Sequence, residues 1–210
     1  LTLDVKNTEV IQKLIGIYEA QKNTARLMEL YDKLMNLTQK DKGMLSRQGL
    51  MYRNQKLNDK AIKSYEDVVS MDVGNEEALA ALADLYEERK DYKNAAKYLG
   101  ALINVKPNPG ANLRLAGLYL GMRDSASAVE PLERYTAVKA TDRDNLYLLA
   151  RCYISQKDFG KAELVLEKVV GQIRKTPSGN AGEIYLAYAN ALEGNGKPDA
   201  AIAAFESAVQ

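Results

Sequence analysis

The stretch EEALAALADLYEERKDYKNAAKYLGALINVKPN, residues 76–108, contains two amphipathic patterns joined by a short polar turn. Its first half places Leu79, Leu82, Ala83 and Tyr86 at the i, i+3, i+4, i+7 spacing of one helix face. The second half repeats this spacing after the turn at 89–91. Proline cannot continue a helix, so Pro107 ends the pattern. The stretch therefore predicts a helical hairpin.

The hairpin pattern recurs along the chain about every 34 residues, which is close to the length of the opening stretch. One column of tyrosines has separations of 34, 34, 33 and 34 residues: Tyr18, Tyr52, Tyr86, Tyr119 and Tyr153. Three residues before these tyrosines lie Ile15, Gly49, Ala83, Ala116 and Ala150. Nine residues after them lie Leu27, Ala61, Ala95, Ala128 and Ala162. Columns in register across five units indicate a repeat protein, and a sixth unit follows with Leu192 in the tyrosine column.

These columns resemble the tetratricopeptide repeat (TPR) family, whose units pair a W-x2-L-G-x2-Y helix with an A-x3-F helix and a closing proline. The resemblance covers nearly the whole chain, although tryptophan is absent and the closing proline is clear only at Pro107. It implies an all-α fold, a right-handed α-solenoid (TPR superhelix) of antiparallel helix pairs with about 12 helices. We expect one TPR domain over 1–210, with repeats at 8–41, 42–75, 76–108, 109–142, 143–181 and 182–210. The expected helices are 8–21, 24–38, 42–54, 58–71, 76–89, 92–105, 109–122, 125–138, 143–156, 159–174, 181–194 and 198–209.

The first residues continue the repeat pattern. Residues 3–7 match residues 71–75 at a distance of 68, which is two periods. We therefore expect residues 1–7 to be the end of a preceding repeat, and the sequence to be a segment of a longer TPR array.

Composition argues against most enzyme classes. Histidine is absent, which removes Ser-His-Asp chemistry and histidine-ligated metal sites. The single cysteine, Cys152, has no histidine to activate it, so we expect a buried, unreactive thiol. No convergent set of nucleophile, base or metal ligands emerges. We predict a protein that is not an enzyme and uses no cofactor or metal.

Charge and hydropathy restrict the partners. The chain has 29 Lys and Arg against 28 Asp and Glu, without a basic arm, which disfavours nucleic acid as a partner. No apolar run approaches the roughly 18 residues of a transmembrane helix, so we expect no direct membrane insertion by this segment. The composition leaves both reducing and oxidising compartments open.

The resemblance also implies where a ligand would bind. In TPR proteins, the first helices of successive hairpins line a concave groove that accepts an extended peptide or a helix. Carried over position by position, the candidate groove residues are Arg47, Arg53, Asp84, Glu87, Glu88, Arg114, Tyr147, Arg151 and Asn190. The same columns hold Leu148, Ile154 and Leu186. We expect an acidic region of the groove in the third repeat, formed by Asp84, Glu87 and Glu88, and a basic, apolar surface in the later repeats. That surface would suit a ligand with an apolar or aromatic anchor and acidic flanks.

One familiar use of the family is disfavoured. Chaperone-binding members clamp a C-terminal carboxylate with a Lys/Asn pair in one repeat, and none of the corresponding position pairs here holds that combination.

We interpret the chain as a non-enzymatic protein–protein interaction scaffold that binds partner proteins or peptides in the groove. Two alternatives stay open. In the first, the segment is the TPR region of a larger bacterial envelope protein that supports polysaccharide secretion or complex assembly. In the second, it is a scaffold that self-assembles through its solenoid ends.

Overall fold

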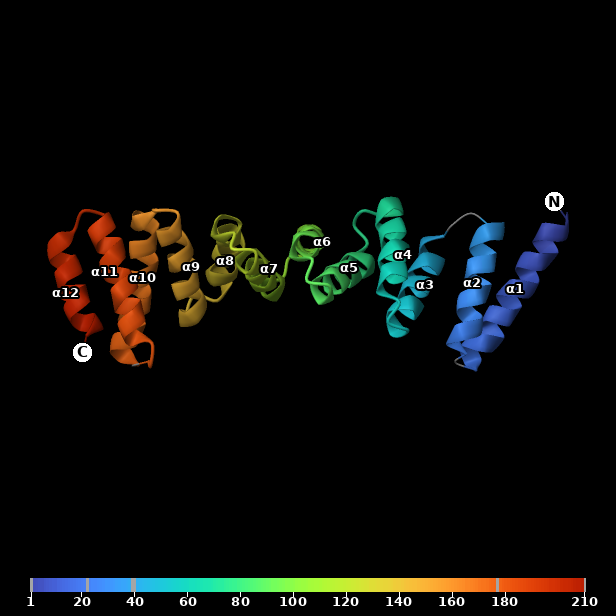
Figure 1. Cartoon of the computed structure of the whole chain (residues 1–210), viewed down its shortest axis with the longest axis horizontal. Coiled ribbons are helices and arrows are strands. Elements are labelled where there is room, and N and C mark those ends of the chain that lie inside the picture. Colours follow the sequence, from blue (N-terminus) through green and yellow to red (C-terminus); the bar gives the residue numbers. More distant parts are fainter. Residues whose placement is uncertain (1, 22, 39–40, 177, 210) are drawn as a thin grey trace. The chain divides into compact units, whose positions relative to one another are not determined.

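The computed structural model describes residues 2–21, 23–38, 41–176 and 178–209, with the side chains of this set from residue 7 onward. Within these residues the chain is all-α (Figure 1). In order, the helices are α1 (Thr2–Ala20), α2 (Thr24–Leu37), α3 (Lys42–Asn54), α4 (Asn58–Met71), α5 (Glu76–Glu88), α6 (Tyr92–Val105), α7 (Pro109–Gly121), α8 (Ser125–Val138), α9 (Arg143–Ser155), α10 (Phe159–Lys175), α11 (Ala181–Gly194) and α12 (Pro198–Ala208).

The helices fall into two compact units. The first, Leu1–Lys106, contains α1 to α6, and the second, Pro107–Gln210, contains α7 to α12. Inside each unit, odd-numbered and even-numbered helices form hairpins, and each hairpin packs on the next (Figure 1). The described helices thus form a helical solenoid of repeated pairs, as the sequence predicts. The expectation of one domain over 1–210 remains a prediction.

A three-residue turn closes the hairpins in a recurring way. After α5, the Asp91 N–H donates to the Tyr86 carbonyl at 2.9 Å, and Lys90 adopts a left-handed conformation with φ of 61°. This is a Schellman-type helix end. The Asp91 side chain then accepts a hydrogen bond from the Asn94 N–H and caps α6. Equivalent left-handed residues follow α3, α7, α9 and α11: Lys56, Arg123, Lys157 and Gly196.

The repeat columns form the core. The small residues of the first helices and their partner alanines are buried in the hairpins that carry them, and their small size lets the two helices approach closely. The fully buried members, at 0% exposure, are Ala61, Ala83, Ala95, Ala116, Ala128, Ala150 and Ala162. Next to them, Tyr65, Leu99, Leu132 and Leu166 are also buried, at 1% exposure or less. The packing that the columns predict is therefore confirmed.

Gly49 occupies a tight position between α3 and α4. An added Cβ there would lie 2.9 Å from the Tyr65 ring. Because that ring is only 1% exposed, it has little room to move. The absence of a side chain at Gly49 is what lets α3 and α4 pack this closely.

One expected helix boundary is wrong. The first helix was expected to begin at residue 8, but α1 begins at Thr2. The matching stretch before α5 is broken at Gly74, whereas Lys6 occupies that position here, and lysine is a much better helix former than glycine. Whether residues 1–7 also end a preceding repeat remains a prediction, and their side chains lie outside the described residues.

None of the helices in the described ranges combines the length and hydrophobicity required to span a membrane.

Candidate functional site: a pocket between α9 and α11

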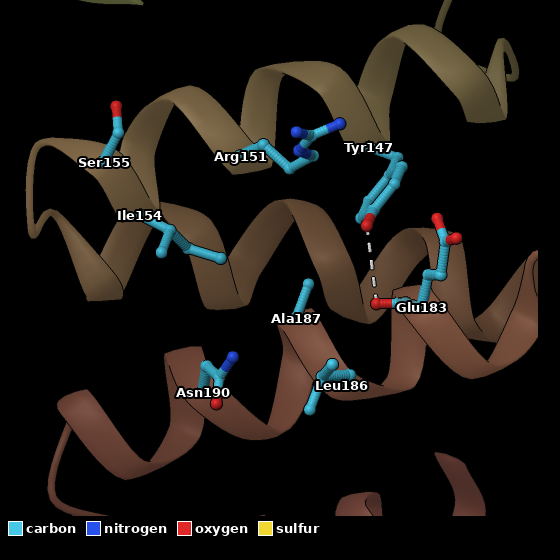
Figure 2. A pocket seen from close by; sticks show the side chains of 8 residues that line it. All are labelled: Tyr147, Arg151, Ile154, Ser155, Glu183, Leu186, Ala187 and Asn190. Carbon is cyan, nitrogen blue, oxygen red and sulfur yellow. Dashed lines mark hydrogen bonds between the residues drawn. The ribbon is translucent and has the colours of Figure 1, made fainter. Parts of the chain in front are cut away.

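A pocket of about 410 Å³ lies in the second unit between the first helices of the fifth and sixth repeats (Figure 2). Its lining comes from one face of each helix, at i, i+4, i+7, i+8 on α9 and i, i+3, i+4, i+7 on α11. The lining residues are Tyr147, Arg151, Ile154, Ser155, Glu183, Leu186, Ala187 and Asn190. The site therefore follows directly from helical periodicity on two neighbouring helices.

Two polar contacts organise one end of the pocket. The Tyr147 hydroxyl donates a 3.4 Å hydrogen bond to the Glu183 backbone carbonyl, which ties α9 to α11 (Figure 2). The Arg151 guanidinium lies 5.8 Å from the Tyr147 ring centroid, within the range of a cation–π contact. Burial raises the pKa of Tyr147, and the charge of Arg151 only partly opposes this shift. The phenol is therefore neutral near pH 7 and can act as a donor.

The rest of the lining divides into apolar and polar parts. Ile154 and the buried Ala187 give an apolar surface, and Leu186 adds an exposed apolar side chain. Exposed Arg151 and Asn190 offer hydrogen-bond donors to a ligand. The pocket can thus hold an apolar side chain while donating to an acceptor beside it.

Three candidate residues of the first unit contact one another. Arg53 of α3 donates from Nη2 to Asp84 Oδ2 at 3.2 Å, and the same nitrogen lies 3.6 Å from Glu88 Oε1. Asp84 and Glu88 are one turn apart on α5, so one guanidinium serves both. The negative charge of the acidic region predicted for the third repeat is consequently neutralised in part by an arginine of the second repeat.

The remaining candidates lie outside the pocket. Arg47 of α3 donates from Nη1 to the Tyr31 hydroxyl at 3.4 Å and lies 3.5 Å from Glu19 Oε1. Glu87 of α5 and Arg114 of α7 are both partly buried. The pocket thus brings together Tyr147, Arg151 and Asn190. Arg47, Glu87 and Arg114 do not line it.

Sequence reasoning missed three pocket residues: Ser155, Glu183 and Ala187. Ser155 lies one turn after Arg151, and Glu183 lies one turn before Ala187. Extending the expected groove face by one turn would have found Ser155 and Glu183, and widening it on α11 would have found Ala187, which lies between Leu186 and Asn190.

No described part of the chain gathers three or more acidic or cysteine side chains in a metal-binding arrangement. Cys152 lies on the opposite, buried side of α9 at 2% exposure, and burial raises the pKa of its thiol. This is the environment of an unreactive cysteine, as expected.

Three family models match parts of the chain. Two tetratricopeptide repeat models match residues 47–112 and 182–210. A model of anaphase-promoting complex (cyclosome) subunit 3 matches residues 88–170. The sequence matches none of the curated proteins with which it was compared.

Solved structures share the fold. A MamA crystal structure is 23% identical, with 80% of this chain and 90% of that chain covered and a TM-score of 0.54. YrrB, described as a TPR protein with an unusual peptide-binding site, is 12% identical, with coverage of 85% and 90% and a TM-score of 0.56. The Naa15/Naa10 complex bound to HypK contains a chain that is 18% identical, with coverage of 96% and 31% and a TM-score of 0.68.

Repeat columns, paired helices, family models and structural neighbours agree with one another. The chain is a tetratricopeptide repeat protein.

Proposed function

We propose that the chain is a non-enzymatic scaffold that binds a partner peptide in the α9/α11 pocket. The observation that carries the proposal is the pairing of Arg151 with Tyr147 above an apolar wall of Ile154 and Leu186. TPR proteins bind proteins or peptides through grooves of this kind, and the YrrB neighbour is described as having a peptide-binding site.

The pocket suggests the chemistry of the ligand. Its volume suits one large side chain, and its mixture of apolar wall and polar groups is typical of binding pockets. Arg151 is placed to donate two hydrogen bonds to a carboxylate, and Asn190 can add one from the opposite helix. We therefore propose a segment with an aromatic or aliphatic anchor next to an acidic residue.

The proposal is tested by selecting peptides from a random library on the immobilised chain and measuring their affinities. Arg151→Glu should weaken the selected peptides about 10- to 100-fold, because a charge-assisted hydrogen bond is lost and repulsion is added. Arg174→Glu is the matched control, since Arg174 is an exposed arginine on α10 in the same unit. Equal affinities for wild type and Arg151→Glu would refute the proposed site.

One of the two alternatives from the sequence leads to a different measurement. A scaffold that self-assembles would show an apparent mass that rises with concentration in light scattering, whereas a peptide-binding monomer would not. The TPR region of an envelope protein would bind its partners through the same pocket, so the Arg151 variant tests that alternative as well.

A further inference from the structure

A second cavity, of about 330 Å³, lies in the first unit among α2, α3 and α4. One wall is the ring of Tyr52, and the polar side chains of Gln48 and Ser64 lie beside it. Both are buried, at 3% and 5% exposure, in positions that most repeats fill with apolar side chains. Gln48, for example, stands where Leu82 and Leu149 stand in other repeats.

The third repeat shows what fills this space elsewhere in the chain. Ser64 lies three residues after Ala61, and the residue three after Ala95 is Tyr98. The Tyr98 ring stacks on Tyr86 with centroids 5.6 Å apart and an interplanar angle of 10°. The Tyr98 hydroxyl donates to Glu66 Oε1 at 3.1 Å, and Lys97 Nζ lies 4.9 Å from its ring centroid.

The second repeat keeps the surroundings of that ring. Tyr52 stands in the position of Tyr86, and its hydroxyl donates to Asp32 Oδ1 at 3.1 Å, as Tyr86 donates to Glu66. Lys63 stands in the position of Lys97 and lines the cavity. The space beside Tyr52 therefore has no ring of its own, but Lys60, which also lines the cavity, places its Nζ 5.4 Å from the Tyr52 ring centroid. The Asp32 carboxylate lies at the end of this wall, where it accepts from the Tyr52 hydroxyl.

A polar network replaces the missing side chain. Ser64 Oγ donates to Gln48 Oε1 at 3.1 Å, and Gln48 Nε2 donates to Asp32 Oδ1 at 2.5 Å. The Ser64 hydroxyl oxygen and the Asp32 carboxylate have more acceptor positions than these bonds use, so the wall favours an occupant that donates a hydrogen bond.

We infer that this cavity is a slot for a tyrosine side chain of a partner polypeptide, which takes the place of the Lys60 ammonium group over Tyr52, stacks on that ring and directs its hydroxyl to the Asp32 carboxylate. Stacked rings at this spacing are favourable, and Lys63 can cover the outer face as Lys97 covers Tyr98. Phenylalanine lacks the donor, and phosphotyrosine would bring its charge against Asp32. The slot is in the first unit and does not depend on the α9/α11 pocket.

The test is an NMR titration of the full ¹⁵N-labelled chain with N-acetyl-tyrosinamide. We expect saturable shifts confined to α2, α3 and α4 with a Kd on the order of 1 mM, as suits a ligand of this size. N-acetyl-phenylalaninamide should bind at least 10-fold more weakly. Absence of saturable binding, or equal affinity for the two amides, would overturn the inference. Binding of p-cresol without binding of N-acetyl-tyrosinamide would restrict the slot to free phenols and would also overturn it.

A variant whose own side chains fill the slot provides a second test. The double variant Gln48→Leu, Ser64→Tyr rebuilds the Leu82 and Tyr98 pair of the third repeat, so it should raise the melting temperature and abolish binding. Ser70→Tyr is the control, because Ser70 is exposed on the same helix and its variant should bind normally. If the double variant loses its helical circular dichroism signal, Ser64→Leu takes its place, since Leu30 fills this position in the first repeat. Unchanged binding by a folded filled variant would refute the slot.

Discussion

The Tyr86 hydroxyl donates a 2.8 Å hydrogen bond to Glu66 Oε1, twenty residues earlier in the chain. The bond joins the first helix of the third repeat to the second helix of the second repeat. Two further pairs have the same separation: Tyr52 with Asp32, and Tyr153 with Glu133. Three tyrosines of the column thus form hydrogen bonds between neighbouring hairpins.

A double-mutant cycle should measure the strength of this bond. Tyr86→Phe and Glu66→Ala should each destabilise the chain by about 1–3 kcal/mol. The first removes one of the two hydrogen bonds that Glu66 accepts, and the second leaves the Tyr86 and Tyr98 hydroxyls without their acceptor. Their combined effect should be smaller than the sum of the two. Urea unfolding followed by circular dichroism gives the four free energies, and strict additivity would contradict a direct interaction.

The same contacts predict a loss of stability at alkaline pH. Burial, followed by the charge of Asp32, raises the pKa of Tyr52 to about 12. An unfolded tyrosine ionises near pH ~10, so the unfolded state loses its proton first. The stabilisation is therefore complete below about pH 10 and is lost as the pH rises toward 12.

Tyr52→Phe isolates this contribution from the other groups that titrate in the same range. Between pH 10 and 12, the free energy of unfolding should fall more steeply for wild type than for the variant. Parallel slopes in urea titrations at pH 8, 10, 11 and 12 would show that the tyrosine does not contribute.

Gly49→Ala should destabilise the protein although alanine favours helices. The new Cβ would lie 2.9 Å from the buried Tyr65 ring, so the overpacking should cost about 1–3 kcal/mol. Gly16→Ala is the control, because no atom lies within 4 Å of its added Cβ and the helix propensity should add about 0.5–1 kcal/mol. Thermal melts of the two variants should therefore shift in opposite directions. A stabilised Gly49→Ala would contradict the close packing of α3 on α4.

Lys90→Gly should stabilise the hairpin of the third repeat. Lys90 has a φ of 61°, which glycine adopts without strain, so we expect a gain of roughly 0.5–1 kcal/mol. Lys97→Gly, seven residues later in the interior of α6, should instead lower stability, because glycine is a poor residue in a helix interior. A destabilised Lys90→Gly would show that the lysine side chain matters more than the backbone conformation.

Much of the fold follows from periodicity. Every expected helix after the first agrees with the structure to within one residue at both ends. The reason is local: the polar turns carry capping residues such as Asp91 and Asn75, and each is followed at once by a helical pattern. The start of α1 was wrong because a repeat match was given more weight than the absence of glycine at Lys6.

The candidate site was only partly predictable. Column positions found Tyr147, Arg151 and Asn190, because helical spacing fixes which residues share a face. The pairing of Arg53 with Asp84 was not foreseen, since it depends on how far one side chain reaches toward the neighbouring hairpin. The cavity beside Tyr52 was missed for a different reason. The sequence signal for this cavity is the polar residue Gln48 at a position where other repeats have leucine. It is found only by looking for repeats that depart from the common residue.

The most direct test of peptide binding in the α9/α11 pocket is to map a selected peptide onto the ¹⁵N-labelled chain by NMR. We predict saturable shift changes at the backbone amides of Tyr147, Arg151 and Asn190, with α10 and α12 largely unaffected. Shifts concentrated on α10 and α12, with those three amides unchanged, would contradict binding in the pocket.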